Sequence, residues 1–278
     1  MCSGTRRTKE RDLENAAIFL WSLGGFLLLW PLSVWRRDAS MVDFWWGPGQ
    51  SVMAAAAWVA AGQPSGPARL MFACVAIWGL RLGIQLGRRR ILEGREDPRY
   101  TALRRHWSPG FWWKSLLVVF LLQSALQILI AAAPIAAIQA GAGEIGGLAV
   151  AGALIWLTGM TVETVADLQL DLYRRRHGHG GLLTRGLRSV VRHPHYAGEI
   201  LVWAGIALIA LDAGIWWAPL SAMLVTMLLW KVSGVPFLDE HMGETRSRYA
   251  AYARSVPALI PTMRRAQRLA QAGRRERV

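Results

Sequence analysis

The sequence contains only two cysteines, Cys2 and Cys74, and they lie far apart in the chain. Two distant thiols supply neither a disulfide framework nor the paired cysteines of a structural zinc site. The glycine-rich loop His177-Gly-His-Gly-Gly181 carries two histidines, but no further ligands have a suitable spacing. The loop also lacks the preceding strand and the spacing of a dinucleotide-binding fingerprint. We therefore expect no metal site.

Acidic residues are also scarce, since 18 Asp and Glu stand against 32 Lys and Arg, which gives a formal charge of +14. In a soluble protein such a balance predicts nucleic-acid binding. Here 53% of the residues are hydrophobic, and they fall into long uncharged runs. The sequence therefore indicates an integral membrane protein that binds no nucleic acid.

The uncharged runs have the length of membrane-spanning helices, which need about 20 apolar residues. We predict an all-α protein with seven transmembrane helices, at 16–35, 44–62, 70–87 (interrupted by Arg81), 115–143, 145–162, 200–211 and 213–230. The first run has no cleavage site after it, so we expect a retained helix. Residues 1–263 are predicted to form a single domain, and 264–278 a basic, disordered tail suited to anionic lipid.

The arginines are unevenly distributed among the predicted connections. They crowd into 88–105, 174–192 and 231–278, whereas 63–68, 141–144 and 212–214 carry little charge. The positive-inside rule places the arginine-rich connections and the C-terminus in the cytosol of what we expect to be a bacterial inner membrane. Five ionisable residues then share the cytosolic half, and we expect a cytosol-facing cavity there: Asp43, Arg81, Glu163, Asp167 and Glu199. The alternative is a set of helix-end residues and structural ion pairs.

The segment Arg192-His-Pro-His-Tyr-Ala-Gly-Glu199 places strong polar groups at the mouth of a predicted membrane helix. The helix start after Pro194 leaves backbone N–H groups for an anion, and Arg192 offers a fork for phosphate. His193 and His195 can donate hydrogen bonds, and Glu199 can accept them. The alternative is a helix cap within a basic surface patch.

Two further groups of residues have ligand-binding chemistry. Glu163 and Asp167 share one helix face and could accept from nucleotide hydroxyls, while Arg174 could hold phosphate. Trp45 and Trp46 flank Asp43 and Gln50, so they could line a pocket for a flat apolar ligand. Headgroup anchoring is the alternative for the arginine and the tryptophans.

These motifs resemble those of the steroid 5-alpha-reductase family, in particular its bacterial branch. The resemblance also includes Gly180-Gly-Leu, Tyr252 and the closing Pro257-Ala-Leu-Ile-Pro261. The bacterial features are Asp43-x-x-Trp46-Gly and Trp78-Gly-Leu-Arg81. The resemblance implies seven helices, NADPH in a cytosolic cavity and reduction of the C4–C5 double bond of 3-oxo-Δ4 steroids. Hydride is delivered to C5 and a proton to C4 without a flavin.

The resemblance also implies roles for individual residues. An acid and a hydroxyl polarise the 3-keto oxygen in the family; here Asp43 is the candidate acid, and Gln50 and Tyr100 are candidate donors. Trp78 stands where the family has its tyrosine, and we expect it to line the substrate pocket with Trp45 and Trp46. Including the motif residues, the predicted cofactor contacts are Arg81, Arg89, Arg90, Glu163, Asp167, Arg174, Arg192, His193, His195, Tyr196, Glu199 and His241. His195 stands at a position where better-known members of that family carry asparagine.

Two other functions remain open from the sequence. Isoprenylcysteine carboxyl methyltransferases also carry an Arg-His-Pro-x-Tyr-x-Gly motif and use S-adenosylmethionine. A channel or transporter would predict inverted repeats, and none is visible. The expected partners are a steroid or other lipid enone and membrane lipids, and the expected state is a monomer.

Overall fold

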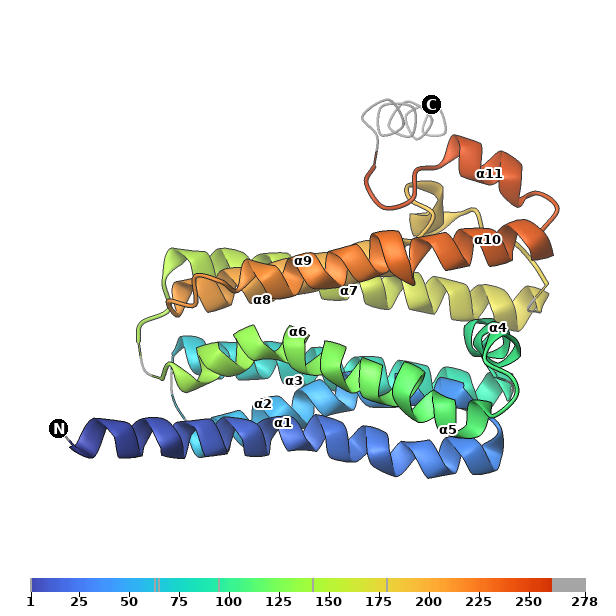
Figure 1. Ribbon diagram of the computed structural model, residues 1–278. Coiled ribbons are helices and arrows are strands. Elements are labelled where there is room, and N and C mark those ends of the chain that lie inside the picture. The colour runs from blue at the N-terminus through green and yellow to red at the C-terminus, as the bar shows by residue number, and fades with distance from the viewer. Residues whose placement is uncertain are drawn as a thin grey trace, which may run out of the picture. The chain divides into compact units, whose positions relative to one another are not determined.

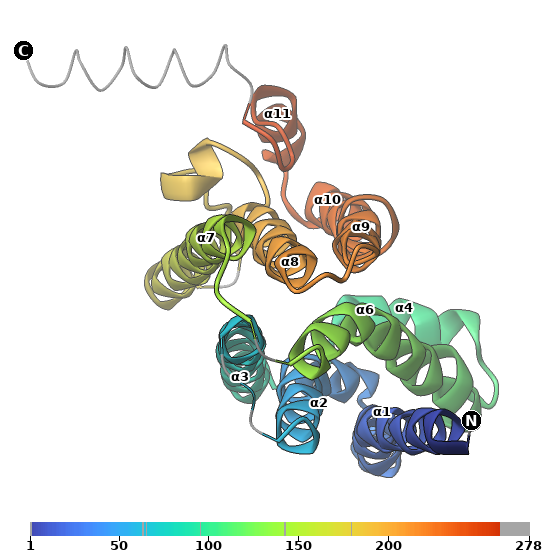
Figure 2. The same cartoon turned by 90° about the vertical axis from the view of Figure 1, so that its left-hand side faces the viewer.

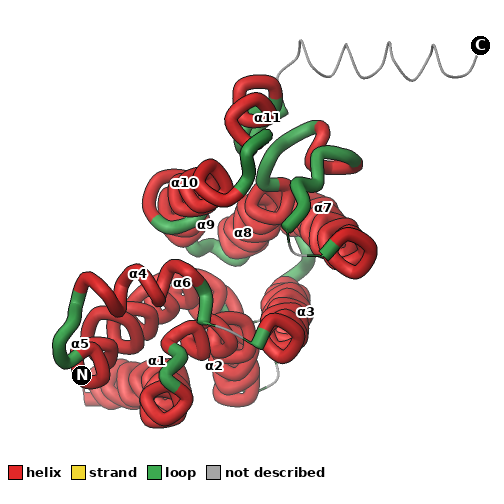
Figure 3. Tube along the Cα trace, turned by 90° about the vertical axis from the view of Figure 1, so that its right-hand side faces the viewer, coloured by secondary structure: helices red, strands yellow, loops and turns green. Residues whose placement is uncertain are grey.

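The computed structural model describes residues 2–62, 64, 66–94, 96–141, 143–178 and 180–261. Within these ranges every regular element is a helix, and no strand occurs (Figure 3). The predicted disordered tail, 264–278, and His179 lie outside the described residues.

The elements follow one another as helices joined by short connections (Figure 1). The α-helices are α1 (Cys2–Arg36), α2 (Trp46–Ala60), α3 (Pro67–Glu93), α4 (Pro98–His106), α5 (Phe111–Ser115), α6 (Leu122–Gln139), α7 (Gly147–His177), α8 (Pro194–Asp212), α9 (Pro219–Met227), α10 (Val235–Thr245) and α11 (Tyr249–Ser255). The 3-10 helices are η1 (Ala39–Trp45) and η3 (Gly186–Ser189), and the π-helical turns are η2 (Leu116–Leu121) and η4 (Leu228–Val232).

Six helical stretches among the described residues are long and apolar enough to cross a membrane. They are Ala16–Arg36, Pro67–Ile91, Phe111–Gln139, Gly147–His177, Pro194–Asp212 and Pro219–Thr245. Helix α2 occupies the second predicted span but has 15 residues, fewer than the roughly 20 that a span needs. An all-α, multi-pass membrane protein is thus supported. The seven-helix count and the cytosolic cavity stay predictions.

The chain divides into two compact units that interleave in sequence. The N-terminal unit comprises Met1–Ala153 and Ile206–Ser221, and the C-terminal unit comprises Leu154–Gly205 and Ala222–Val278. In the N-terminal unit, α2 contacts α1, α3 and α6 (Figures 1 and 2). A Cβ atom on Gly79 of α3 would come within 2.3 Å of the Gly47 carbonyl oxygen of α2. Small residues are therefore required where these two helices meet.

Buried amides fix the start of α2 against α6. Gln127 donates from Nε2 to the carbonyl oxygens of Trp45 and Trp46, at 3.0 and 2.8 Å. Gln50 donates in return to the Gln127 carbonyl oxygen at 3.2 Å. Buried amides of this kind are costly unless bonded, so the reciprocal contacts specify how α2 docks.

Glycines also allow close contact within the C-terminal unit. A Cβ atom on Gly159 of α7 would lie 2.6 Å from the Gly198 carbonyl oxygen of α8. After α10, the short helix α11 buries Tyr249 and Tyr252, which form a small apolar cluster with Val256. The C-terminal segment is thereby held against its own unit.

Candidate functional site

The N-terminal unit joins two of the predicted catalytic residues, Asp43 on η1 and Tyr100 on α4. The Tyr100 hydroxyl donates to Asp43 Oδ1 at 2.6 Å, and Arg99 Nη2 donates to Asp43 Oδ2 at 2.7 Å. The Asp43 side chain is 20% exposed, and Tyr100 is 5% exposed. The result is a hydrogen-bonded acid–phenol pair held by an arginine.

Aspartate caps position both elements of this pair. Asp38 precedes η1 and accepts from the Ser40 N–H at 3.1 Å, while Asp97 precedes α4 and accepts from the Arg99 N–H at 2.9 Å. Pro98 occupies the first position of α4, where its missing N–H is not needed. The local sequence therefore starts both helices at residues that bring Asp43 and Tyr100 together.

Burial controls the protonation of the pair. Burial raises the pKa of the Asp43 carboxyl, and the Arg99 guanidinium and the Tyr100 hydroxyl oppose this shift. Burial, followed by the neighbouring Asp43, raises the pKa of Tyr100 well above its ordinary value. For Asp97 burial acts in the same direction, but Arg99 outweighs it and lowers the pKa. The Tyr100 phenol therefore keeps its proton at neutral pH and remains a donor.

Other residues predicted in this region have separate contacts. Gln50 bonds to the Gln127 backbone and is not part of the Asp43–Tyr100 hydrogen bond. Trp46 donates to Gln123 Oε1 at 2.6 Å, the Trp45 ring lies against Gly25, and Trp78 is fully buried. These placements leave the proposed roles of the four residues untested.

The predicted arginines of α3 face carboxylates of the same unit. Arg90 forms a salt bridge with Asp38, and the charge of Arg89 acts on Asp43 and Asp97. Arg81 lies within α3 and is half-buried. Their roles as cofactor contacts stay predictions.

In the C-terminal unit, Asp239 of α10 gathers several donors that precede α8 or belong to α11. Arg192 Nη2 donates to Asp239 Oδ2 at 2.6 Å, and His193 Nε2 lies 2.7 Å from Oδ1. The Tyr249 hydroxyl also donates to Oδ1. Because a carboxylate only accepts, His193 carries its proton on Nε2.

The same segment is bonded to the end of the chain through its backbone. The N–H groups of Arg192 and His193 donate to the carbonyl oxygens of Pro257 and Ala258, at 2.8 and 3.0 Å. Arg192 Nη1 donates to the Val256 carbonyl oxygen at 2.6 Å. The guanidinium and imidazole that were predicted to meet a cofactor are thus bonded to acceptors within the protein.

Sequence reasoning missed this function of Asp239. The acid was visible in Leu238-Asp-Glu-His241, but nothing local connects it to His193 and Arg192, which lie 46 and 47 positions earlier. The scarcity of acidic residues beside so many arginines is the signal that could have indicated a structural pairing.

Burial also sets the charge of the groups around Asp239. Burial lowers the pKa of His193, against the opposing effect of the Asp239 carboxylate. Burial acts the same way on Arg192, but the hydrogen bond to Asp239 outweighs it and raises the pKa. At neutral pH the cluster therefore contains a cationic arginine and a neutral histidine.

The remaining predicted cofactor residues lie in the same unit. Glu163 of α7 is buried at the glycine contact, where a Cβ atom on Gly198 would lie 2.7 Å from the Glu163 nitrogen. Glu199 follows Gly198 directly, and Asp167 is one turn further along α7. The contact between α7 and α8 therefore brings the acidic residues of the two motifs into one region.

The last of the predicted cofactor residues are three aromatic side chains and an arginine near the end of α7. The His195 and Tyr196 rings have centroids 4.1 Å apart, and His241 of α10 stacks on Phe237 at 6.2 Å. Arg174 lies in the last turns of α7 within the run Arg174–His177.

Comparison with known proteins connects the chain to membrane enzymes. Over 90 residues it is 29% identical to Protein-S-isoprenylcysteine O-methyltransferase B of Arabidopsis thaliana, a match that covers 31% of this chain and 43% of that protein. No solved structure matches the chain. Residues 29–256, which include every candidate residue above, match the family described as "Protein of unknown function (DUF1295)". The chain therefore belongs to the DUF1295 family.

Proposed function

We propose that the protein reduces the C4–C5 double bond of 3-oxo-Δ4 steroids, or of a similar lipid enone, with NADPH as the reductant. The observation that carries this proposal is the hydrogen bond of 2.6 Å between Tyr100 and Asp43. The DUF1295 family also includes steroid 5-alpha-reductase-like membrane proteins, which supports the same reaction class.

An enone accepts hydride at its β-carbon when a donor stabilises the negative charge that develops on the carbonyl oxygen. Tyr100 is the proposed donor, because burial keeps its phenol protonated. Its single O–H proton, which donates to Asp43 in this structure, would turn to the ketone oxygen when the substrate binds. Asp43 orients the Tyr100 hydroxyl, and Arg99 holds Asp43. Phe26 and Phe111 belong to the buried apolar cluster that surrounds the Tyr100 ring.

NADPH, when bound, would supply the hydride and leave as NADP⁺, and the substrate would gain that hydride at C5 and a proton from water at C4. The residues of the C-terminal unit fit such a cofactor chemically. Arginines from Arg174 to Arg176 could hold its phosphates, and the buried Glu163, with Asp167 and Glu199, could accept from its hydroxyl or amide groups. Arg192 and His193 would act indirectly, since Asp239 binds both.

The test uses the purified full-length chain in nanodiscs with NADPH and progesterone. We expect NADPH oxidation that requires the steroid, and a product heavier by two hydrogen atoms. Tyr100→Phe should lower kcat by roughly 10²-fold, the loss typical of one missing oxyanion donor, without changing the Kd for NADPH. An unchanged kcat would exclude Tyr100 as the donor.

Asp212→Asn is the matched control for Asp43→Asn. Asp212 accepts from the Gly146 N–H at 2.9 Å in a local contact between helix ends. We expect Asp43→Asn to slow turnover and Asp212→Asn to leave it unchanged. Equal effects of the two substitutions would show that Asp43 has no special part in the reaction.

A methyltransferase is the second candidate, and the partial similarity to an isoprenylcysteine methyltransferase favours it. Methyl transfer requires no polarised ketone, so the Asp43–Tyr100 pair would have no catalytic role. Methyl transfer from S-adenosylmethionine to an isoprenylcysteine acceptor, without steroid-dependent NADPH oxidation, would replace the reductase proposal.

A further inference from the structure

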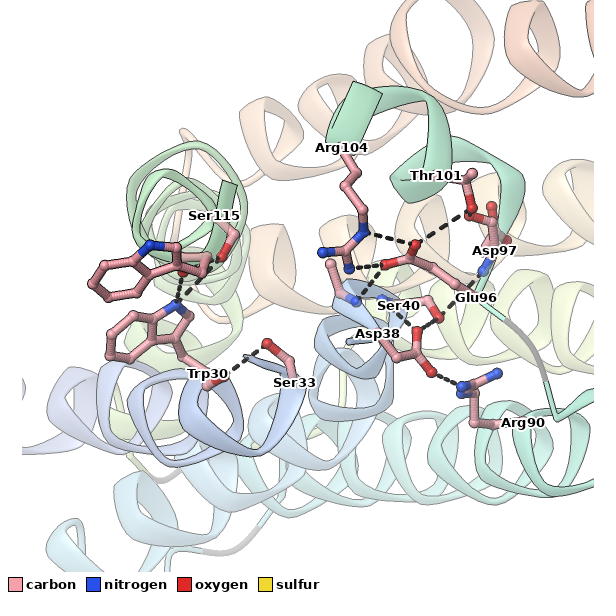
Figure 4. Close-up of polar contacts among 12 residues, drawn as sticks. Trp30, Ser33, Asp38, Ser40, Arg90, Glu96, Asp97, Thr101, Arg104 and Ser115 are labelled. Carbon is pink, nitrogen blue, oxygen red and sulfur yellow. Dashed lines mark hydrogen bonds and ion pairs between the residues drawn. The ribbon is translucent and has the colours of Figure 1, made fainter. Parts of the chain in front are cut away.

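A cavity of about 330 Å³ lies in the N-terminal unit, between the end of α1 and the start of α5. Its lining includes Ser33, Arg37, Arg104, Phe111, Trp112 and Ser115. Two of the described lining residues are arginines, and none is a carboxylate. Figure 4 shows how Ser33 of α1, Arg104 of α4 and Ser115 of α5 lie in this region. The lining therefore has the chemistry of an anion site.

Arg104 is held in a fixed position beside this cavity. Its Nε and Nη2 donate to the two carboxylate oxygens of Glu96, at 3.2 and 2.6 Å (Figure 4). Its guanidinium carbon also lies 4.7 Å from the centroid of the Phe111 ring. These contacts use two of the three guanidinium nitrogens, so Nη1 can donate to a ligand without reorganisation.

Arg37 contributes a cation with an unusual backbone. It follows the last turn of α1 with φ of 52°, the left-handed conformation that glycine adopts most easily at a helix end. The side chain is exposed, and among the described residues no hydrogen-bond or salt-bridge partner contacts its guanidinium. An arginine at this position costs conformational energy that glycine would not, which points to a function for its charge.

Two stretches that are long and apolar enough to span a membrane have ends beside the cavity, so in a membrane the cavity would lie at the level of the lipid headgroups. Ala16–Arg36 ends, and Phe111–Gln139 begins, at residues beside the cavity. Trp35 and Trp112 are 73% and 59% exposed, as is typical of tryptophans at the membrane–water interface. The Trp30 indole donates to the Trp112 carbonyl oxygen at 3.1 Å and thereby fixes the adjoining wall.

We propose that this cavity binds the phosphate group of an anionic phospholipid. Arg37 and Arg104 would donate to the phosphate oxygens, and the exposed tryptophans would contact the glycerol and upper acyl chain. A free phosphate offers the same oxygen atoms, but it would not use the apolar surface beside the cavity. Neither Asp43 nor Tyr100 lines this cavity, and the lipid proposal does not depend on the reaction proposed above.

The test compares thermal unfolding of the full chain in nanodiscs of phosphatidylcholine with and without phosphatidylglycerol. Phosphatidylglycerol should raise the Tm of the wild type, and Arg37→Gln should remove most of this increase. In a detergent titration the same variant should bind phosphatidylglycerol about fivefold more weakly, the effect of one basic residue near a lipid surface. Arg105→Gln, an exposed arginine of α4 that does not line the cavity, is the control and should keep the wild-type response.

Arg37→Gly separates ligand binding from folding. Glycine suits the left-handed backbone, so this variant should be at least as stable as the wild type in phosphatidylcholine and still lose the response to phosphatidylglycerol. A loss of Tm that is equal in both lipids would mean that Arg37 has only a structural role. If inorganic phosphate alone reproduces the increase in Tm, and Arg37→Gln abolishes it, the ligand is free phosphate and the lipid assignment is wrong.

Discussion

Substituting Asp239 by asparagine should release the C-terminal segment from the start of α8. Asparagine preserves the size of the side chain, but it removes the negative charge that Arg192, His193 and Tyr249 share. Hydrogen bonds to charged groups contribute roughly 1.5–3 kcal/mol each. Since the Asp239 side chain is 28% exposed, solvent replaces part of this loss, and we expect about 3 kcal/mol for the whole cluster.

Amide hydrogen exchange measures this loss of stability at the two backbone hydrogen bonds that join the start of α8 to the C-terminal segment. The N–H groups of Arg192 and His193 donate to carbonyl oxygens of Pro257 and Ala258. A loss of about 3 kcal/mol should speed their exchange roughly a hundredfold, because each 1.4 kcal/mol is a factor of ten. Peptides from the centres of α2 and α3 should exchange as in the wild type.

Glu240→Gln is the matched control, because it removes the same charge from the neighbouring, exposed position. We expect it to leave the exchange of residues 192 and 193 unchanged. If Asp239→Asn also left this exchange unchanged, the reasoning that the Asp239 cluster holds the segment in place would be refuted.

Three other perturbations test separate parts of the structure. The lowered pKa of His193 means that the unfolded chain binds a proton more readily than the folded chain, so the contribution of His193 to stability should be full above pH 6.5 and fall as the pH decreases toward the lowered pKa. Hydrogen exchange of the His193 amide, corrected for its intrinsic rate, should speed up in that pH window. An exchange rate that does not change with pH would contradict the lowered pKa. Gly79→Ala should lower the Tm through overpacking of roughly 1–3 kcal/mol, whereas Gly24→Ala, with no atom within 4 Å of its Cβ, should be neutral or stabilising. Gln127→Leu should destabilise the protein by about 1–3 kcal/mol because the carbonyl of Trp46 loses its donor, and a wild-type Tm would show that water replaces the bond.

The long helices could be predicted from the sequence because long apolar runs dominate their local preference. The boundaries differ where charged residues continue a helix: α3 runs through Arg81 to Glu93, well past the predicted end at residue 87. Helix α2 is shorter than its uncharged run, because residues 44 and 45 belong to the 3-10 helix that Asp38 caps and residues 61 and 62 form a turn. A hydropathy pattern contains no information on such a cap-dependent change.

The polar contacts were predictable only in part. Asp43 and Tyr100 were both proposed from the resemblance, whereas Arg99, which holds Asp43, was not. The pairing of Arg192 and His193 with Asp239 could not be inferred, because the partners are far apart in sequence and many other arginines compete for few acids. Only the fold determines which of them meet.

The Asp239 cluster also has a consequence for the order in which the protein is made. Ribosomal synthesis adds about 5–20 residues per second, so Arg192 and His193 leave the ribosome roughly 2–9 seconds before Asp239, which lies 46 residues after His193. During that time the residues that precede α8 lack their counter-charge. Chains that stop before Pro257 would also lack the carbonyl oxygens that receive the two backbone N–H groups. The final acceptors of the Arg-His-Pro segment are thus among the last parts of the described chain to be synthesised.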